Sequence, residues 1–119
     1  MWHHVNQVTQ YADNEFRGSV ELPKDSLWFS GHFPDDPILP GVAQVGMVLN
    51  AIQQLHKRPL KILKISRVRF KQIIRPEDSL MVILKQFEGK LSYSFQIIAN
   101  DNVACTGIMD VDINPSSSV

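Results

Sequence analysis

The chain has 119 residues, of which 44% are hydrophobic, and its 12 Lys and Arg side chains balance its 12 Asp and Glu side chains. This length and composition fit one domain with a real core, and the near-neutral charge argues against nucleic acid as a partner. The sequence has no apolar run of the roughly 18 residues that a membrane span requires, its first residues lack the layout of a signal peptide, and its single cysteine, Cys105, excludes an internal disulfide. We therefore expect a cytoplasmic protein with one domain over residues 1–114 and a disordered tail over residues 115–119.

The first predicted elements are two strands joined by a turn at Asp13 and Asn14. Apolar residues flank this turn in a pattern typical of strands. They are Val8 and Tyr11 before the turn, and Phe16, Val20 and Leu22 after it. A long loop follows, in which Pro34, Pro37 and Pro40 fix φ, so the loop has few conformations to lose on folding.

The apolar period becomes helical from Gly41 to about Lys57. The helical stripe consists of Val42, Val45, Val48, Leu49, Ile52 and Leu55. Met47 and Ala51 widen this stripe, so we expect the helix to be enclosed on more than one side. Pro59 ends the helix.

Every segment after Pro59 is typical of a strand. The stretch from Leu60 to Ile74 is long and rich in β-branched residues, and later strands meet across turns at residues 88–89 and 100–102. The order is therefore two strands, one long helix and about four strands. An α+β fold, with an antiparallel sheet wrapped around the central helix, is the simplest way to bury that helix.

Two segments resemble a known family. The sequence GHFPDDPILPGVAQV, residues 31–45, resembles the signature of the hotdog-fold (3R)-hydroxyacyl-[acyl-carrier-protein] dehydratases of fatty acid synthesis. The sequence ISRVRFKQIIRPEDSLMV, residues 65–82, resembles a strand and turn of the same family, and the likeness runs from about Val5 to Asp112.

The resemblance implies a hotdog fold and a homodimer, or a higher homo-oligomer of dimers, with active sites at the ends of acyl tunnels that cross the interface. It implies a 3-hydroxyacyl substrate held as a thioester on the phosphopantetheine of acyl carrier protein, and elimination of water from it. It implies no metal and no organic cofactor. His3 and His4 have no cysteine or carboxylate at ligand spacing, so the residues themselves also predict no zinc site.

Two residues are candidates for catalysis. By resemblance, His32 is the base that takes a proton from the carbon beside the thioester carbonyl, and imidazole suits that role at neutral pH. The alternative is a histidine that only bonds a loop carbonyl. Gly41 begins the helix, where the first N–H groups lack intrahelical acceptors and could stabilise a negative carbonyl oxygen. The alternative is a glycine needed only for the turn into the helix.

The motif departs from the family five positions after Gly41. The family has Glu or Asp there, as the acid that acts on the leaving hydroxyl, and this chain has Gly46. The glycine either makes room for substrate or water, or marks a site that has lost the reaction. Asn50 lies one turn further on the same face. We predict substrate contacts at Phe33, Pro40, Val42, Gly46 and Asn50.

Basic residues gather in the middle of the chain. Eight of the 12 Lys and Arg residues lie between Lys57 and Arg75, and no Asp or Glu occurs between Asp36 and Glu77. The block is either a solvated strand face or a docking surface for an acidic partner. On the second interpretation, we predict that acyl carrier protein docks on Lys64, Arg67, Arg69 and Lys71.

Three functions remain open from the sequence. The first is a dehydratase-type enzyme of acyl thioesters. The second is a catalytically impaired hotdog protein that binds acyl carrier protein or an acyl thioester, including the inactive partner of a heteromeric dehydratase. The third is a thioesterase, which needs a water activator that the sequence does not clearly supply.

Overall fold

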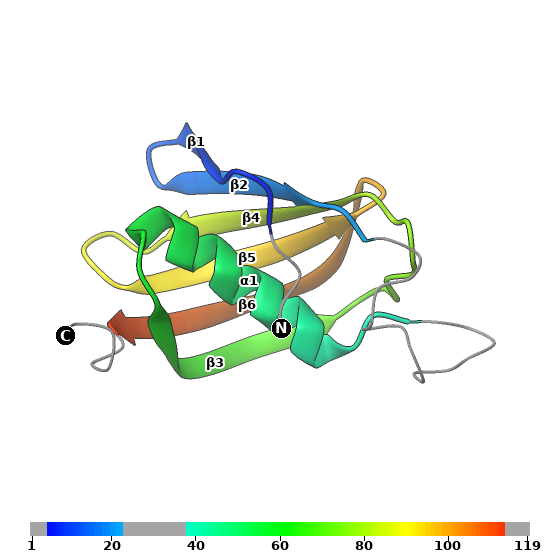
Figure 1. Cartoon of the computed structure of the whole chain (residues 1–119). Coiled ribbons are helices and arrows are strands. Elements are labelled where there is room, and N and C mark those ends of the chain that lie inside the picture. The colour runs from blue at the N-terminus through cyan, green and yellow to red at the C-terminus, as the bar shows by residue number, and fades with distance from the viewer. Residues whose placement is uncertain (1–4, 23–37, 114–119) are drawn as a thin grey trace.

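The computed structural model of the protein describes residues 5–22 and 38–113 (Figure 1). His32, Phe33 and the predicted tail lie outside these residues. The elements in chain order are β1 (Thr9–Ala12), β2 (Glu15–Val20), α1 (Gly41–His56), β3 (Leu60–Phe70), β4 (Leu80–Gln86), β5 (Ser92–Ala99) and β6 (Asn102–Ile113).

The strands form one six-stranded sheet in the order β1-β2-β4-β5-β6-β3, and every neighbouring pair is antiparallel. The sheet curls around α1, which lies along its inner face (Figure 1). This arrangement confirms the predicted order of elements and the predicted α+β class. The one hairpin of the first half turns at Asp13 and Asn14, as expected.

The core lies between α1 and the inner face of the sheet. The helix buries Ala43, Met47, Val48, Ala51 and Ile52, and the sheet faces them with Val82, Leu84, Phe95, Ile97 and Met109. The widened apolar stripe of α1 is therefore enclosed, as its sequence predicts. Val42 is the exception, because 56% of its surface remains exposed near the start of the helix.

Contacts in the C-terminal half of α1 fix its position. Near the C-terminal end, the His56 Nε2 atom lies 2.6 Å from the Tyr93 hydroxyl, and Lys57 closes the helix in a left-handed conformation at φ 54°. On the solvent side, Asn50 Oδ1 accepts a hydrogen bond from the Val5 N–H at 2.9 Å, and Gln54 Nε2 donates to the Val5 carbonyl at 2.6 Å. The N-terminal segment is thus tied across the helix.

The predicted strand from Leu60 to Ile74 is shorter in the structure and irregular. It ends at Phe70 because the N–H groups of Lys71 and Gln72 both donate to the Ala104 carbonyl, at 2.8 and 3.2 Å, and the chain leaves the sheet. Its pairing with β6 shifts between Ser66 and Arg69, and Arg67 has a φ of 54° there. An extra residue in one strand of a pair bends that strand.

One edge of β3 has no strand beside it among the residues that the structure describes. Apolar side chains are exposed on β3 and next to it. They are Leu63, Ile65, Phe70 and Ile73, with Val42 of α1 close to the same end of the molecule. An exposed strand edge with apolar side chains favours pairing with another chain.

Gly107 of β6 lies where the core has no room for a side chain. A Cβ built there would meet the Phe95 ring at 2.5 Å and Val68 at 3.2 Å, and the ring is 2% exposed. We expect Gly107→Ala to lower the free energy of unfolding by about 2–3 kcal/mol, since overpacking forces buried groups to shift. Urea titration measures this as a lower midpoint at unchanged slope.

Gly41→Ala is the matched control for that variant. Its Cβ would meet the Phe70 ring at 2.8 Å, but this ring is 56% exposed and is free to turn away. We expect a change of less than about 1 kcal/mol. Equal losses in the two variants would contradict the packing argument.

Candidate functional site

The N-terminal end of α1 is the electropositive feature of the site. Pro40 precedes it in an extended conformation, and the N–H groups of Ala43 and Gln44 donate to the Pro40 carbonyl at 3.1 and 3.2 Å. The N–H groups of Gly41 and Val42 come before these bonds and therefore have no acceptor within the helix. The first turn has no acidic side chain to offset the positive end of the helix dipole.

Gly41 itself approaches an aromatic ring. Among the described glycines only Gly89 has a positive φ, so the backbone conformation does not require glycine at position 41. A Cβ there would lie 2.8 Å from the Phe70 ring, which is exposed and free to turn away. The donor role of Gly41 and its role in the turn into the helix both stay predictions.

A hollow of about 380 Å³ opens beside this helix end. One wall comes from residues 38–41 and Gln44, and the other from residues 70–73. Pro40, one of the predicted substrate contacts, lines this hollow. Gly41, the predicted catalytic donor, also lines it. Val42 is exposed outside it, and Gly46 is buried further along α1. Asn50 lies still further along α1, where its Oδ1 accepts a hydrogen bond from the Val5 N–H.

Gln44 is a site residue that the motif did not single out. It is the only buried polar residue among those described, with 4% of its surface exposed. Its Nε2 donates to the Leu39 carbonyl at 3.2 Å, while its Oε1 is buried and has no hydrogen-bond partner among the described residues. A buried acceptor without a partner is costly, which makes this oxygen a candidate ligand contact beside the hollow. An amide among apolar helix positions was the signal in the sequence.

The helix supplies no carboxylate. None of the residues of α1, from Gly41 to His56, is Asp or Glu. The described residues also contain no group of three or more His, Cys, Asp or Glu side chains that could hold a metal ion. Chemistry at this helix end therefore depends on backbone donors and on groups that come from elsewhere.

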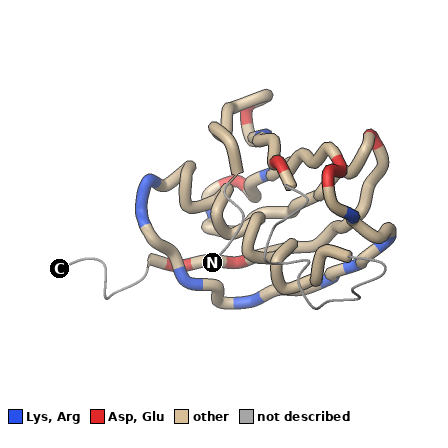
Figure 2. The backbone as a smooth tube through the Cα atoms, turned by 45° about the vertical axis from the view of Figure 1, so that its right-hand side comes forward, with Lys and Arg blue, Asp and Glu red and all other residues tan. Residues whose placement is uncertain are grey.

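A second hollow, of about 450 Å³, lies on the outer face of the sheet and is basic. It brings together three of the four predicted docking residues, Arg67, Arg69 and Lys71. Lys64 does not line it, and pairs in register with Asp110 instead. Figure 2 shows basic residues following β3 along one edge of the molecule, where few acidic residues interrupt them.

Cys105 belongs to the core, as its position in a strand predicts. It is fully buried on β6, and this burial raises the pKa of its thiol to about 11. A thiol in that state is a poor nucleophile at neutral pH.

Comparisons with known proteins agree with this arrangement. Residues 7–108 match the model of a family described as ApeI-like, ApeI dehydratase.

Within the part of the chain that the structure covers, no helix is both long and apolar enough to cross a membrane.

Two curated relatives are 3-hydroxyacyl-[acyl-carrier-protein] dehydratases named FabZ. The protein of Syntrophobacter fumaroxidans is 32% identical over 68% of this chain, and the match spans 60% of its own length. The protein of Caldicellulosiruptor saccharolyticus is 34% identical over 76% of this chain and 72% of its own length.

Among solved structures, a chain of the dehydratase heterocomplex ApeI:P from Xenorhabdus doucetiae superimposes with a TM-score of 0.80 at 29% identity. The match covers 93% of this chain and 98% of that one. The predicted hotdog fold is confirmed.

Proposed function

The chain belongs to the ApeI-like dehydratase family, and from this we propose that it is a hotdog subunit of a hydro-lyase that removes water from a 3-hydroxyacyl thioester on acyl carrier protein. The observation that carries the proposal is the first turn of α1. It presents N–H donors without intrahelical acceptors at Gly41, which has no side chain of its own, beside a hollow that Gln44 helps to line.

Two steps of the elimination, proton removal and stabilisation of the carbonyl oxygen, have a candidate group. His32 takes the proton from the carbon beside the carbonyl, and the C–H electron pair moves toward the thioester. The Gly41 N–H donates to the carbonyl oxygen as negative charge develops there. The pair then returns to form the double bond, and the hydroxyl of the next carbon leaves with a proton as water.

The helix supplies no proton donor for that hydroxyl. Gly46 has no side chain, and α1 carries no carboxylate. We propose water or a second subunit as the donor of this proton. The similarity to a chain of a dehydratase heterocomplex favours a second hotdog subunit, paired along the exposed edge of β3. This proposal replaces a strict homodimer with a dimer of either like or unlike subunits.

Acyl carrier protein is the proposed macromolecular partner. The sequence around β3 has basic residues without acidic ones, and Arg67, Arg69 and Lys71 meet on one surface. An acidic carrier would be attracted to such a surface at low salt and less so at high salt.

One assay separates the candidate functions. Purified protein is incubated with 3-hydroxyacyl and with trans-2-enoyl carrier protein, and hydration, dehydration and free thiol are followed. We expect slow interconversion of the two substrates without thiol release. Release of free thiol would instead indicate a thioesterase and overturn the proposal.

The absence of a carboxylate on α1 gives specific support to a second candidate, the binding subunit of a heteromeric dehydratase. Such a subunit would bind acyl carrier protein and turn over neither substrate. Binding without turnover by the isolated protein, followed by turnover when a partner subunit is added that is not reduced by His32→Ala in this chain, would support this role and contradict the catalytic one.

A further inference from the structure

The amide of Gln44 is held over the first turn of α1. Long side chains of a helix lean toward its N-terminal end, and Gln44 Nε2 donates to the carbonyl of Leu39, at 3.2 Å, just before the helix begins. Leu39 is itself anchored, because its side chain is buried and its N–H donates to the Ile74 carbonyl at 2.8 Å. The amide group therefore lies alongside the turn that carries the Gly41 N–H.

The bond to Leu39 also fixes which end of the amide is available to a ligand. Only an amide N–H can donate to the Leu39 carbonyl, so Nε2 faces that carbonyl and Oε1 faces away from it. Oε1 is buried and accepts no hydrogen bond from any residue that the structure describes. The amide thus presents an acceptor of fixed orientation that the described part of the chain does not use.

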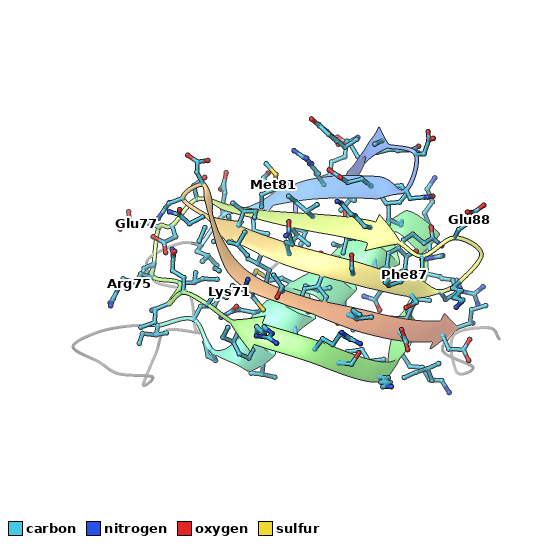
Figure 3. All side chains as sticks on the ribbon, turned by 180° about the vertical axis from the view of Figure 1, so that it is seen from behind. Lys71, Arg75, Glu77, Met81, Phe87 and Glu88 are labelled. Atoms are coloured by element: carbon cyan, nitrogen blue, oxygen red, sulfur yellow. The ribbon has the colours of Figure 1, made fainter. Side chains whose placement is uncertain are left out.

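Of the described residues that line the hollow beside Gly41, only Gln44 has a polar side chain shielded from water. The other two polar side chains of the lining, Lys71 and Gln72, are exposed. Figure 3 shows Lys71 at the end of β3, where the outer face of the sheet meets its edge. Water satisfies exposed groups, whereas a buried acceptor without a partner costs free energy. Gln44 is therefore the side chain with most to gain from a ligand in this hollow.

The first turn and Gln44 together offer one donor and one acceptor. The Gly41 N–H has no acceptor within the helix, and Gln44 follows three residues later, so both lie on the same face of α1. A 3-hydroxyacyl thioester has the complementary pair, because its carbonyl oxygen accepts and its hydroxyl donates. The enoyl product keeps the carbonyl and has lost the donor. The two protein groups consequently match the substrate of a dehydration better than its product.

The substrate has a second donor near the carbonyl, the amide N–H of the phosphopantetheine arm. The arm leads out to the carrier protein, so this N–H lies on the solvent side of the carbonyl, whereas the hydroxyl belongs to the acyl chain that enters the protein. Gln44 is 4% exposed, and the apolar side chains of Leu39 and Phe70 line the same hollow. This shielded, apolar setting favours the hydroxyl as the donor to Gln44.

We propose that Gln44 Oε1 accepts a hydrogen bond from the 3-hydroxyl of the bound substrate, and that this contact makes the site prefer hydroxylated acyl chains to dehydrated or saturated ones. The inference rests on the proposed function, since it concerns the same acyl thioester. A site built to bond a substrate hydroxyl rejects an analogue that lacks it, because the buried acceptor is then left unpaired.

Gln44 transfers no proton in this scheme. Its oxygen holds the hydrogen of the hydroxyl, and a lone pair of the hydroxyl oxygen stays free to accept the proton with which it leaves as water. In the direction of hydration, the same oxygen positions the incoming water. Gln44 is thus a specificity-determining contact and not the missing acid.

The test compares two unreactive acyl-pantetheines that differ only in the hydroxyl. An amide N–H replaces the thioester sulfur in both, which keeps the carbonyl and makes the neighbouring carbon too weakly acidic to react. One analogue carries a 3-hydroxyacyl chain and the other the saturated chain, each with butyryl, octanoyl and dodecanoyl lengths. We expect calorimetric titration of the wild-type protein to give a Kd about tenfold lower for the hydroxylated analogue at the length that binds best.

Gln44→Met removes the acceptor while nearly keeping the length of the side chain, and Gln44→Leu removes it in a second shape. In both variants we expect the Kd of the hydroxylated analogue to rise about tenfold and that of the saturated analogue to change less than about twofold. Gln72→Met is the matched control, because it makes the same change at an exposed amide of the same hollow. It should keep the wild-type preference. Urea titration identifies the variants that are folded.

Two results would overturn the inference. One is equal binding of the two analogues by the wild-type protein, and the other is equal weakening of both analogues in the Gln44 variants. The amide would then only brace Leu39 or hold a water molecule, and the proposed function would stand, because the acyl chain still binds. Failure of the wild-type protein to bind any of the analogues would contradict the proposed function together with the inference.

Discussion

Replacing His32 by alanine is expected to lower kcat/KM for the hydration of enoyl carrier protein by about 10²–10⁴-fold, the usual contribution of a general base. The reason is chemical, because His32 is the group to which the resemblance assigns removal of the proton beside the carbonyl, and imidazole suits that role at neutral pH. In the wild type, kcat/KM should rise with pH over the range in which a histidine loses its proton. The variant should lose that dependence.

His56→Ala is the control for the histidine experiment. His56 lies at the opposite end of α1 from Gly41, and its ring nitrogen is bonded to the Tyr93 hydroxyl. We expect this variant to lose stability, because a buried hydroxyl loses its partner, and to keep its kcat/KM within about threefold. Equal loss of activity in both variants would indicate that His32 contributes to the fold and not to proton transfer.

Local sequence patterns predicted the helix and the hairpins well. The apolar period of α1 is strong, and Pro59 follows it, so the predicted helix from Gly41 to about Lys57 differs from the observed one by a single residue. The turn at residues 13–14 lies between the strands that it was predicted to join, and the turn predicted at 100–102 is one residue shorter, because Asn102 already belongs to β6. These features depend on residues that are close together in the sequence, so one sequence is enough to predict them.

Features that depend on a distant strand were missed. The end of β3 at Phe70 is set by the carbonyl of Ala104, which lies on another strand. The bulge at Arg67 appears only in the register with β6. In a regular strand, Arg67, Arg69 and Lys71 would share one face because they alternate along the chain. They do border one hollow, but through an irregularity that the sequence does not reveal.

The polar residues of α1 show the same limit. Asn50 shares the helix face predicted for Gly46, and a substrate contact was the natural hypothesis. In the structure, its Oδ1 instead accepts a hydrogen bond from the N–H of Val5, which lies 45 positions earlier in the sequence. Gln44, two residues before Gly46, is the amide whose oxygen is buried beside the hollow without a hydrogen-bond partner in the part of the chain that the structure describes. Helical spacing tells which residues share a face, but not which element covers that face.

Gly46→Glu is expected to raise the hydration rate of the isolated protein by about 10²-fold or more, if the missing proton donor limits the reaction. Gly46 is a buried residue of a helix that otherwise has no carboxylate. A glutamic acid there would place a proton donor one turn beyond Gly41, on the element that already presents the carbonyl donor. Loss of a helical glycine also favours the helix by about 1 kcal/mol, which offsets part of the cost of burying a polar group.

Gly46→Gln separates proton donation from a change of shape, since glutamine has the same size as glutamate but is not a general acid. Steady-state hydration and dehydration rates of both variants are compared after urea titration has shown that each is folded. A large gain with Glu and none with Gln supports the missing-acid hypothesis. Equal gains would show that filling space near Gly46 is what matters.

A folded Gly46→Glu protein with no gain would mean that the proton donor must come from another position. An unlike subunit at the β3 edge is the first to test, because mixing the wild-type protein with it should then raise the rate without any substitution.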